Sequence, residues 1–205
     1  ADALGADALG FVFAPSPRQV SVDRARLIRE SLPSTVAVIG VFTDQPAESV
    51  AAVDASCRLD YVQIHGEILP QHQLIFGDRL IPAVVVTVED PLSRVISFDQ
   101  PVVLLDAAHT SRAGNRSDPF DWRLAQRSAS QKKIILAGGL NPGNVIEAIE
   151  IVRPYAVDVS SGVERSPGIK DHDKVELFIQ RIRAWDSLTN ADTSVSSADG
   201  SFLRR

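Results

Sequence analysis

Residues with chemical potential follow five short apolar runs of the chain, at the points where those runs end. They are Arg18 after the first run, His65 after the third, Asp106 after the fifth, Gly138-Gly139 after the sixth, and Asp158, Ser160, Ser161 and Gly162 within and after the seventh. In folds that alternate strands and helices, reactive groups gather at the carboxyl ends of the strands. We therefore expect these residues to line one catalytic mouth.

The glycine and serine residues favour phosphate binding. Glycines let the backbone approach an anion closely, and serine hydroxyls and exposed N–H groups donate to its oxygens. The loops after the last two strands of a barrel often form such a site. Each glycine group taken alone indicates little, since glycine also ends strands for steric reasons. Together they predict a phosphate cradle made of Gly138, Gly139, Ser160, Ser161 and Gly162.

Three other side chains suit acid–base or anion chemistry. Asp106 ends a buried apolar run, where desolvation favours the protonated carboxyl of a general acid; its alternatives are a helix cap or a loop ion pair. His65 suits a proton carrier, a ligand donor or a hydrogen-bonded core histidine. Arg18 suits bidentate binding of a carboxylate, or is an ordinary exposed arginine.

Metal and nucleotide chemistry are not indicated. The four histidines lack metal-ligand spacing, and one cysteine cannot build a zinc site. We expect Cys57, near the end of a predicted helix, to be a structural thiol. No run is followed by G-x-G-x-x-G or a Walker loop. We therefore expect neither a metal nor a cofactor.

The elements that must position these residues alternate along the chain. Seven Val- and Ile-rich runs are typical of strands buried on both faces of a parallel sheet: Ala8–Phe13, Val36–Phe42, Tyr61–Ile64, Leu80–Val86, Val102–Leu105, Lys133–Ala137 and Tyr155–Val159. Helical patterns separate or follow them: Ser21–Leu32, Pro46–Ala55, Leu69–Phe76, Val88–Phe98, Asp121–Ser130, Asn141–Val152 and Asp171–Trp185. An open doubly wound sheet and a closed (β/α)8 barrel both fit.

Composition narrows the class of protein. The 205 residues carry a net charge of −5, which disfavours general nucleic-acid binding, and no apolar run approaches the ~20 residues of a membrane helix. A single cysteine favours a reducing compartment, and we expect a cytoplasmic protein. Residues 186–205 are polar and without period, which predicts a barrel domain over residues 1–185 and a disordered tail.

The chain resembles the phosphoribosylanthranilate isomerases, (β/α)8 barrel enzymes of tryptophan biosynthesis. The matching stretches are Gly5–Phe13, Ser16–Ser21, Gly40–Phe42, Gln45-Pro46, Val62–Glu67, Leu104–Asp106, Phe120–Trp122, Ala137–Val145 and Pro154–Glu164, followed by SPGIKDHDK. The resemblance runs in order from Gly5 to about Trp185. Its last two long stretches, AGGLNPGNV and PYAVDVSSGVE, are the most specific to the family.

The resemblance implies an Amadori rearrangement of N-(5-phosphoribosyl)anthranilate to 1-(2-carboxyphenylamino)-1-deoxyribulose 5-phosphate, without metal or organic cofactor. The implied roles are Asp106 as general acid, Arg18 beside the anthranilate carboxylate, Asp158 in contact with substrate, His65 at the mouth, and Gly138, Gly139, Ser160, Ser161 and Gly162 around the phosphate. The only partner implied is this small substrate, and the protein is expected to be a monomer or homodimer.

Two departures from the family pattern shape the expectations. The family begins with a strand reading K-[IV]-C-G, whose cysteine is the general base, and neither that strand nor its cysteine is among these residues. The chain contains no methionine and starts with Ala1, so we expect a barrel lacking its first strand and most of its first helix. The family's glycine-rich loop before FDW is replaced by His109–Pro119 with Gly114 alone. The alternatives are a non-catalytic phospho-ligand-binding remnant and an unrelated phosphosugar enzyme.

Overall fold

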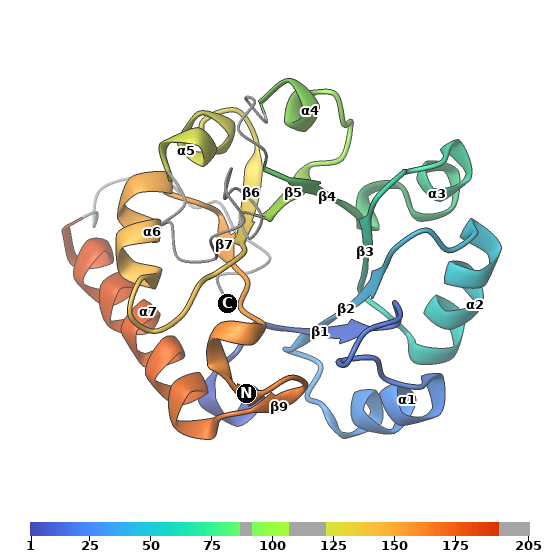
Figure 1. Cartoon of the computed structure of the whole chain (residues 1–205), viewed down its shortest axis with the longest axis horizontal. Coiled ribbons are helices and arrows are strands. Elements are labelled where there is room, and N and C mark those ends of the chain that lie inside the picture. The colour runs from blue at the N-terminus through green and yellow to red at the C-terminus, as the bar shows by residue number, and fades with distance from the viewer. Residues whose placement is uncertain (87–91, 107–121, 193–205) are drawn as a thin grey trace.

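The fold is a curved, seven-stranded parallel sheet with helices on its outer face (Figure 1). It comes from a computed structural model, which describes residues 1–86, 92–106 and 122–192. The strands pair in chain order: β1 Ala8–Val12, β2 Ala37–Phe42, β3 Tyr61–His65, β4 Leu80–Val85, β5 Val102–Asp106, β6 Lys133–Ala137 and β7 Ala156–Val157. All seven predicted strands are confirmed. Because they are parallel, their carboxyl ends lie along the same edge of the sheet.

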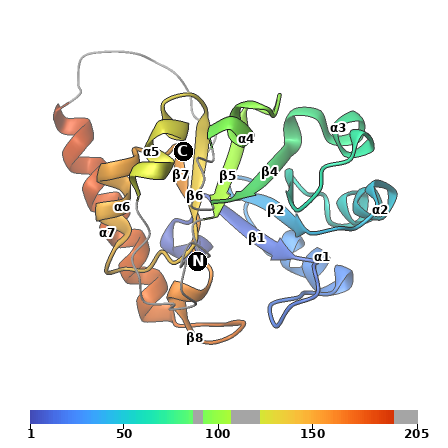
Figure 2. The ribbon, with the colours of Figure 1, turned by 45° about the horizontal axis from the view of Figure 1, so that its top comes forward.

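Helices connect successive strands and cover the outside of the ring. They are α1 Val22–Ser31, α2 Ala47–Cys57, α3 Pro70–Phe76, α4 Leu92–Ile96, α5 Arg123–Ala129, α6 Val145–Val152 and α7 His172–Asp192. Short 3-10 turns are η1 Asp2–Leu4, η2 Gly77–Arg79 and η3 Ser161–Val163. After η3 the chain forms an antiparallel hairpin of β8 Glu164–Ser166 and β9 Ile169–Lys170. Figures 1 and 2 both show α7 beside α6.

The sequence signals for helix starts have mixed outcomes. Ser21 caps α1 as predicted, because its side chain accepts a hydrogen bond from the backbone N–H of Arg24 at 3.3 Å. The predicted start of α6 at Asn141 is wrong. There the chain first makes a turn in which the Asn144 side chain accepts from the Asn141 N–H at 2.8 Å, and the helix begins at Val145.

The sheet separates a small inner core from two larger outer ones. The inner core is made of alternate strand residues, among them Ile39, Ile81, Leu104 and Ile135. The residues between them point outward and pack under α1–α3 on one side and α4–α7 on the other. This two-residue alternation decides which side chains at the strand ends face the middle of the ring.

The outer edges of β1 and β7 carry no strand pairing within the described residues. The two ends of the sheet are instead linked through side chains. Arg183 of α7 donates to the Asp7 carboxylate at 2.8 Å and to the Gly5 carbonyl at 2.6 Å, just before β1. These contacts connect the last helix to the first strand around the ring.

The last helix extends beyond the predicted end of the barrel domain. The tail was expected to begin at residue 186, whereas α7 continues to Asp192; its hydroxyls satisfy carbonyls within the helix, as Thr189 does with Trp185 at 3.0 Å. The rest of the expected tail, the loop His109–Pro119 and Asp121 lie outside the described residues. So does the start of the helix predicted from Val88, of which the structure describes Leu92–Ile96.

Candidate active site

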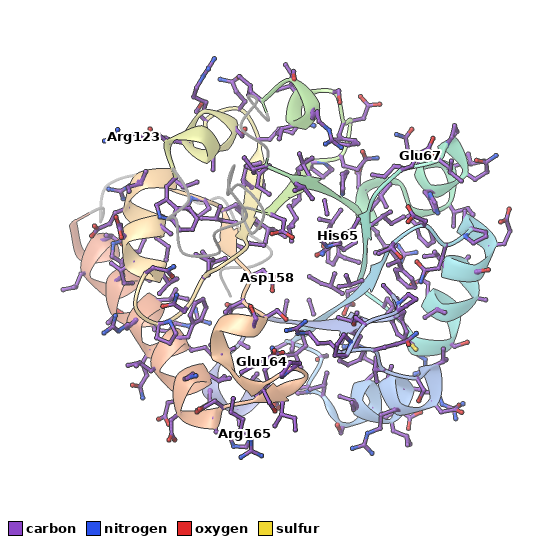
Figure 3. The ribbon with its side chains drawn as sticks, viewed as in Figure 1. His65, Glu67, Arg123, Asp158, Glu164 and Arg165 are labelled. Carbon is purple, nitrogen blue, oxygen red and sulfur yellow. The ribbon has the colours of Figure 1, made fainter. Side chains whose placement is uncertain are left out.

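Three of the predicted site residues face the middle of the ring because of strand alternation. Tyr61, Val102 and Ala156 belong to the inner core, so the residues two or four positions later on the same strands also face inward. These are His65 at the end of β3, Asp106 at the end of β5, and Asp158 just after β7. Figure 3 shows His65 and Asp158 pointing toward the middle of the ring.

Asp106 at the end of β5 and Asp158 just after β7 lie on either side of Ala137 in β6. Asp106 pairs in register with Ala137 of β6, and Val157, the neighbour of Asp158, pairs with Leu136. The pKa of Asp158 is raised, chiefly by desolvation and further by the nearby Asp106, and opposed by Lys170. The two carboxyls therefore lie close enough to interact electrostatically across β6. Asp158 itself is an exposed residue, so its carboxyl is open to solvent.

The surroundings of His65 favour its neutral imidazole form. Burial lowers its pKa, and Asp106 opposes that shift. The Nε2 atom of the buried Gln63 lies 2.7 Å from His65 Nε2. With the amide nitrogen donating, the ring accepts at Nε2 and carries its proton on Nδ1. In that tautomer Nδ1 is the hydrogen-bond donor of the ring.

The predicted phosphate cradle begins with a rigid loop after β6. Gly138 and Gly139 have φ angles of 89° and 66°, which glycine adopts readily. The Asn144 amide donates to the Gly139 carbonyl at 3.0 Å, and Asn141 donates to it at 3.3 Å. The two asparagines hold this loop in place, a role that was not predicted for either residue from the sequence.

The second half of the cradle, Ser160-Ser161-Gly162, packs directly on the first. A side chain at Gly162 would run into the carbonyl oxygen of Leu140. The structure therefore brings together the two segments that the sequence assigned to one site. Only glycine allows the loops after β6 and β7 to approach this closely.

Substituting Gly162 tests this packing. Gly162→Ala is expected to lower the free energy of unfolding by about 3 kcal/mol, since backbone must move to admit the methyl group. The matched control is Gly139→Ala, where nothing lies within 4 Å. Its loss is expected to be about 1 kcal/mol, from the left-handed φ alone. Urea unfolding of both variants checks the difference, and equal losses would contradict the close approach.

Arg18 holds a carboxylate in bidentate fashion, and that carboxylate comes from the chain itself. Its Nε and Nη2 atoms donate to Glu164 at 2.8 and 2.7 Å. Lys170 Nζ also contacts Glu164 at 3.2 Å and donates to the Ser160 carbonyl at 2.8 Å. Neither Glu164 nor Lys170 was predicted from the sequence to be a site residue. Glu164 is the last residue of PYAVDVSSGVE, one of the stretches most specific to the family.

Cys57 lies away from the mouth. It ends α2, is 1% exposed, and its thiol donates to the Val22 carbonyl at 3.7 Å. Burial raises the pKa of this thiol. A buried thiol whose charged form is disfavoured does not act as a base at the strand ends, so the prediction of a structural cysteine is confirmed.

Two negative findings concern the described residues alone. In the three ranges that the structure covers, no group of three or more His, Cys, Asp or Glu side chains is arranged to hold a metal ion. Among the helices of those same ranges, none has the length and hydropathy to cross a membrane.

Comparison with known proteins decides between the families that the fold allows. The sequence model for N-(5'-phosphoribosyl)anthranilate isomerase matches residues 2–181, nearly the whole described fold. The chain belongs to this isomerase family. The family resemblance drawn from the motifs is thereby confirmed.

Individual members of the isomerase family resemble the chain over most of its length. The N-(5'-phosphoribosyl)anthranilate isomerase of Acidithiobacillus ferrooxidans is 46% identical over 187 residues, covering 89% of this chain and 90% of that protein. The crystal structure of the Thermotoga maritima enzyme superimposes with a TM-score of 0.79 at 39% identity, covering 89% and 91% of the two chains. A further isomerase structure, with a TM-score of 0.78 at 39% identity, covers 89% and 90% and contains reduced 1-(o-carboxyphenylamino)-1-deoxyribulose 5-phosphate.

Proposed function

We propose that this chain, completed by a further strand, isomerises N-(5'-phosphoribosyl)anthranilate to 1-(2-carboxyphenylamino)-1-deoxyribulose 5-phosphate in tryptophan biosynthesis. The observation that carries the proposal is the convergence of Asp106, His65 and Asp158 on the inner face beside the two joined glycine loops, in a chain of the isomerase family. The rearrangement moves a hydrogen from C2 to C1 of the sugar with no net oxidation. Acid and base groups therefore suffice for it.

The ligand's two anionic groups are proposed to bind at two different ends of the site. In this proposal the phosphate binds between Gly138-Gly139 and Ser160-Gly162, and the anthranilate carboxylate binds near Arg18. Asp106 protonates the ring oxygen as the furanose opens. His65 and Asp158 contact the substrate between these ends. The isomerase structure that contains the reduced product analogue supports a ligand of this type.

The general base is proposed to come from a further strand. The single thiol of the 205 residues is buried under α1, while the outer edges of β1 and β7 carry no strand among the described residues. We propose that a strand reading K-[IV]-C-G completes the barrel between them and supplies the thiolate. A protein in which the family's first strand and helix precede these 205 residues is called the extended protein below.

The single buried thiol also fits a reducing compartment such as the cytoplasm. A small-molecule substrate is the only partner proposed.

Binding tests this proposal independently of the base. Calorimetric titration of the 205-residue chain with reduced 1-(o-carboxyphenylamino)-1-deoxyribulose 5-phosphate is expected to give one site per chain. Inorganic phosphate is expected to compete for that site, because both use the cradle. Absence of binding in a folded preparation would contradict the proposed substrate.

A further inference from the structure

Glu164 lies where three separate segments of the chain meet. Its side chain is 4% exposed and touches Arg18 from the loop between β1 and α1. It also touches Lys170 of β9, while its backbone carbonyl accepts from Lys174 of α7 at 3.2 Å. Figure 3 shows Glu164 on the segment that follows Asp158 around the ring. A buried carboxylate at such a junction fixes the cations that surround it.

Glu164 lies between two cations that remain partly exposed. Arg18 and Lys170 lower the pKa of Glu164 to about 2, so the carboxylate remains charged at neutral pH. Lys170 also interacts with the Asp158 carboxyl, whereas Glu164 is the carboxylate that acts on Arg18. The Arg18 and Lys170 side chains are 31% and 44% exposed, so both cations are accessible to an anion from solvent.

The hydrogen bonds of Arg18 leave one edge of its guanidinium group available. Glu164 occupies the edge formed by Nε and Nη2. Nη1 has no hydrogen-bond partner in the part of the chain that the structure describes. The Glu164 contact thus fixes the plane of the group and leaves its other edge for a ligand carboxylate.

Lys170 connects the same carboxylate to the phosphate cradle. Its Nζ atom bridges Glu164 and the Ser160 carbonyl, at 3.2 and 2.8 Å. Ser160 precedes η3 and belongs to the cradle proposed above. Through Arg18, Glu164 is linked to the end of the site proposed for the ligand carboxylate. Through Lys170, it is linked to the end proposed for the ligand phosphate.

We propose that Glu164 is a positioning residue that orients Arg18 relative to the cradle and so selects ligands with an anion at each end. This inference rests on the proposed function. It assigns Glu164 no direct contact with the reacting atoms. A purely structural role for Glu164 is the competing interpretation, because the hairpin also packs on the β1–α1 loop at Gly168, beside the Pro17 carbonyl.

Binding of two ligands distinguishes the positioning of Arg18 by Glu164 from a purely structural role of Glu164 in the hairpin. The ligands are the reduced product analogue and the same molecule without the carboxyl group on its ring. Calorimetry of Glu164→Gln is expected to show at least about tenfold weaker binding of the carboxylated ligand and less than twofold weaker binding of the other. Both affinities are measured on one preparation, so a loss of folded protein alters stoichiometry without changing their ratio.

The controls address charge and coupling. Glu150→Gln, on the exposed side of α6, removes the same charge and is expected to leave both affinities unchanged. In an Arg18→Ala background, Glu164→Gln is expected to cause no further loss of affinity for the carboxylated ligand. Equal losses for both ligands, or no loss for either, would overturn the positioning role. Failure of the unmodified chain to bind either ligand would instead contradict the proposed function.

Discussion

Replacing Asp106 by Asn in the extended protein is expected to lower kcat by at least about 100-fold, within the ~10²–10⁴-fold range of general acid–base catalysis. The amide has nearly the shape of the acid but cannot deliver a proton to the ring oxygen. Asp106 faces inward at the carboxyl end of β5 in register with Ala137, so a neutral amide fits the same space. Loss of the fluorescent anthranilate substrate measures the rate.

The control for Asp106 lies at the other end of the same strand. Asp99 is exposed and precedes β5, and Asp99→Asn removes the same charge far from the mouth. Its kcat is expected to match that of the unmodified extended protein. Affinity of Asp106→Asn for the reduced product analogue should change only a few-fold. A kcat within tenfold of the unmodified protein would show that the proton comes from another group.

Gly139→Asp is expected to weaken binding of the reduced product analogue by more than 100-fold. A carboxylate there would lie against the phosphate, and two like charges about 4 Å apart repel by about 4 kcal/mol in a partly exposed protein site. Nothing lies within 4 Å of the added Cβ, so the substitution introduces charge without a clash.

Gly139→Asn is the matched control for that repulsion. Asn has the size of Asp and also tolerates a left-handed φ, so it shares every cost except the charge. Calorimetry should show that Asn retains most of the affinity that Asp loses. Similar affinities for the two variants would show that the ligand phosphate does not bind at the glycine cradle.

The strands could be predicted closely from the sequence. Lys133–Ala137 is an example. A short, continuous run of Ile and Leu between polar segments is typical of a strand that is buried on both faces. The same uniformity conceals which residues face inward. Only the register and the inner core show that Asp106 faces the ring while Leu105 packs outside.

Contacts between distant segments could not be predicted in the same way. Arg18 was recognised as a carboxylate-binding residue, but its partner Glu164 is 146 positions away, on a hairpin that has no strand pattern of its own. The helix end was missed for a different reason. The polar residues after Trp185 continue α7, and the hydroxyls of Ser187 and Thr189 bond to carbonyls of the preceding turn. Such a segment has no apolar stripe from which its helical state could be predicted.

The most direct test of the isomerase assignment compares turnover of N-(5'-phosphoribosyl)anthranilate by the extended protein and by the 205-residue chain. Fluorescence should decay with the extended protein and at least about 100-fold more slowly with the 205 residues alone, which lack a thiol at the mouth. Equal rates would place the base elsewhere among the 205 residues. No turnover by a folded extended protein would contradict the assignment itself.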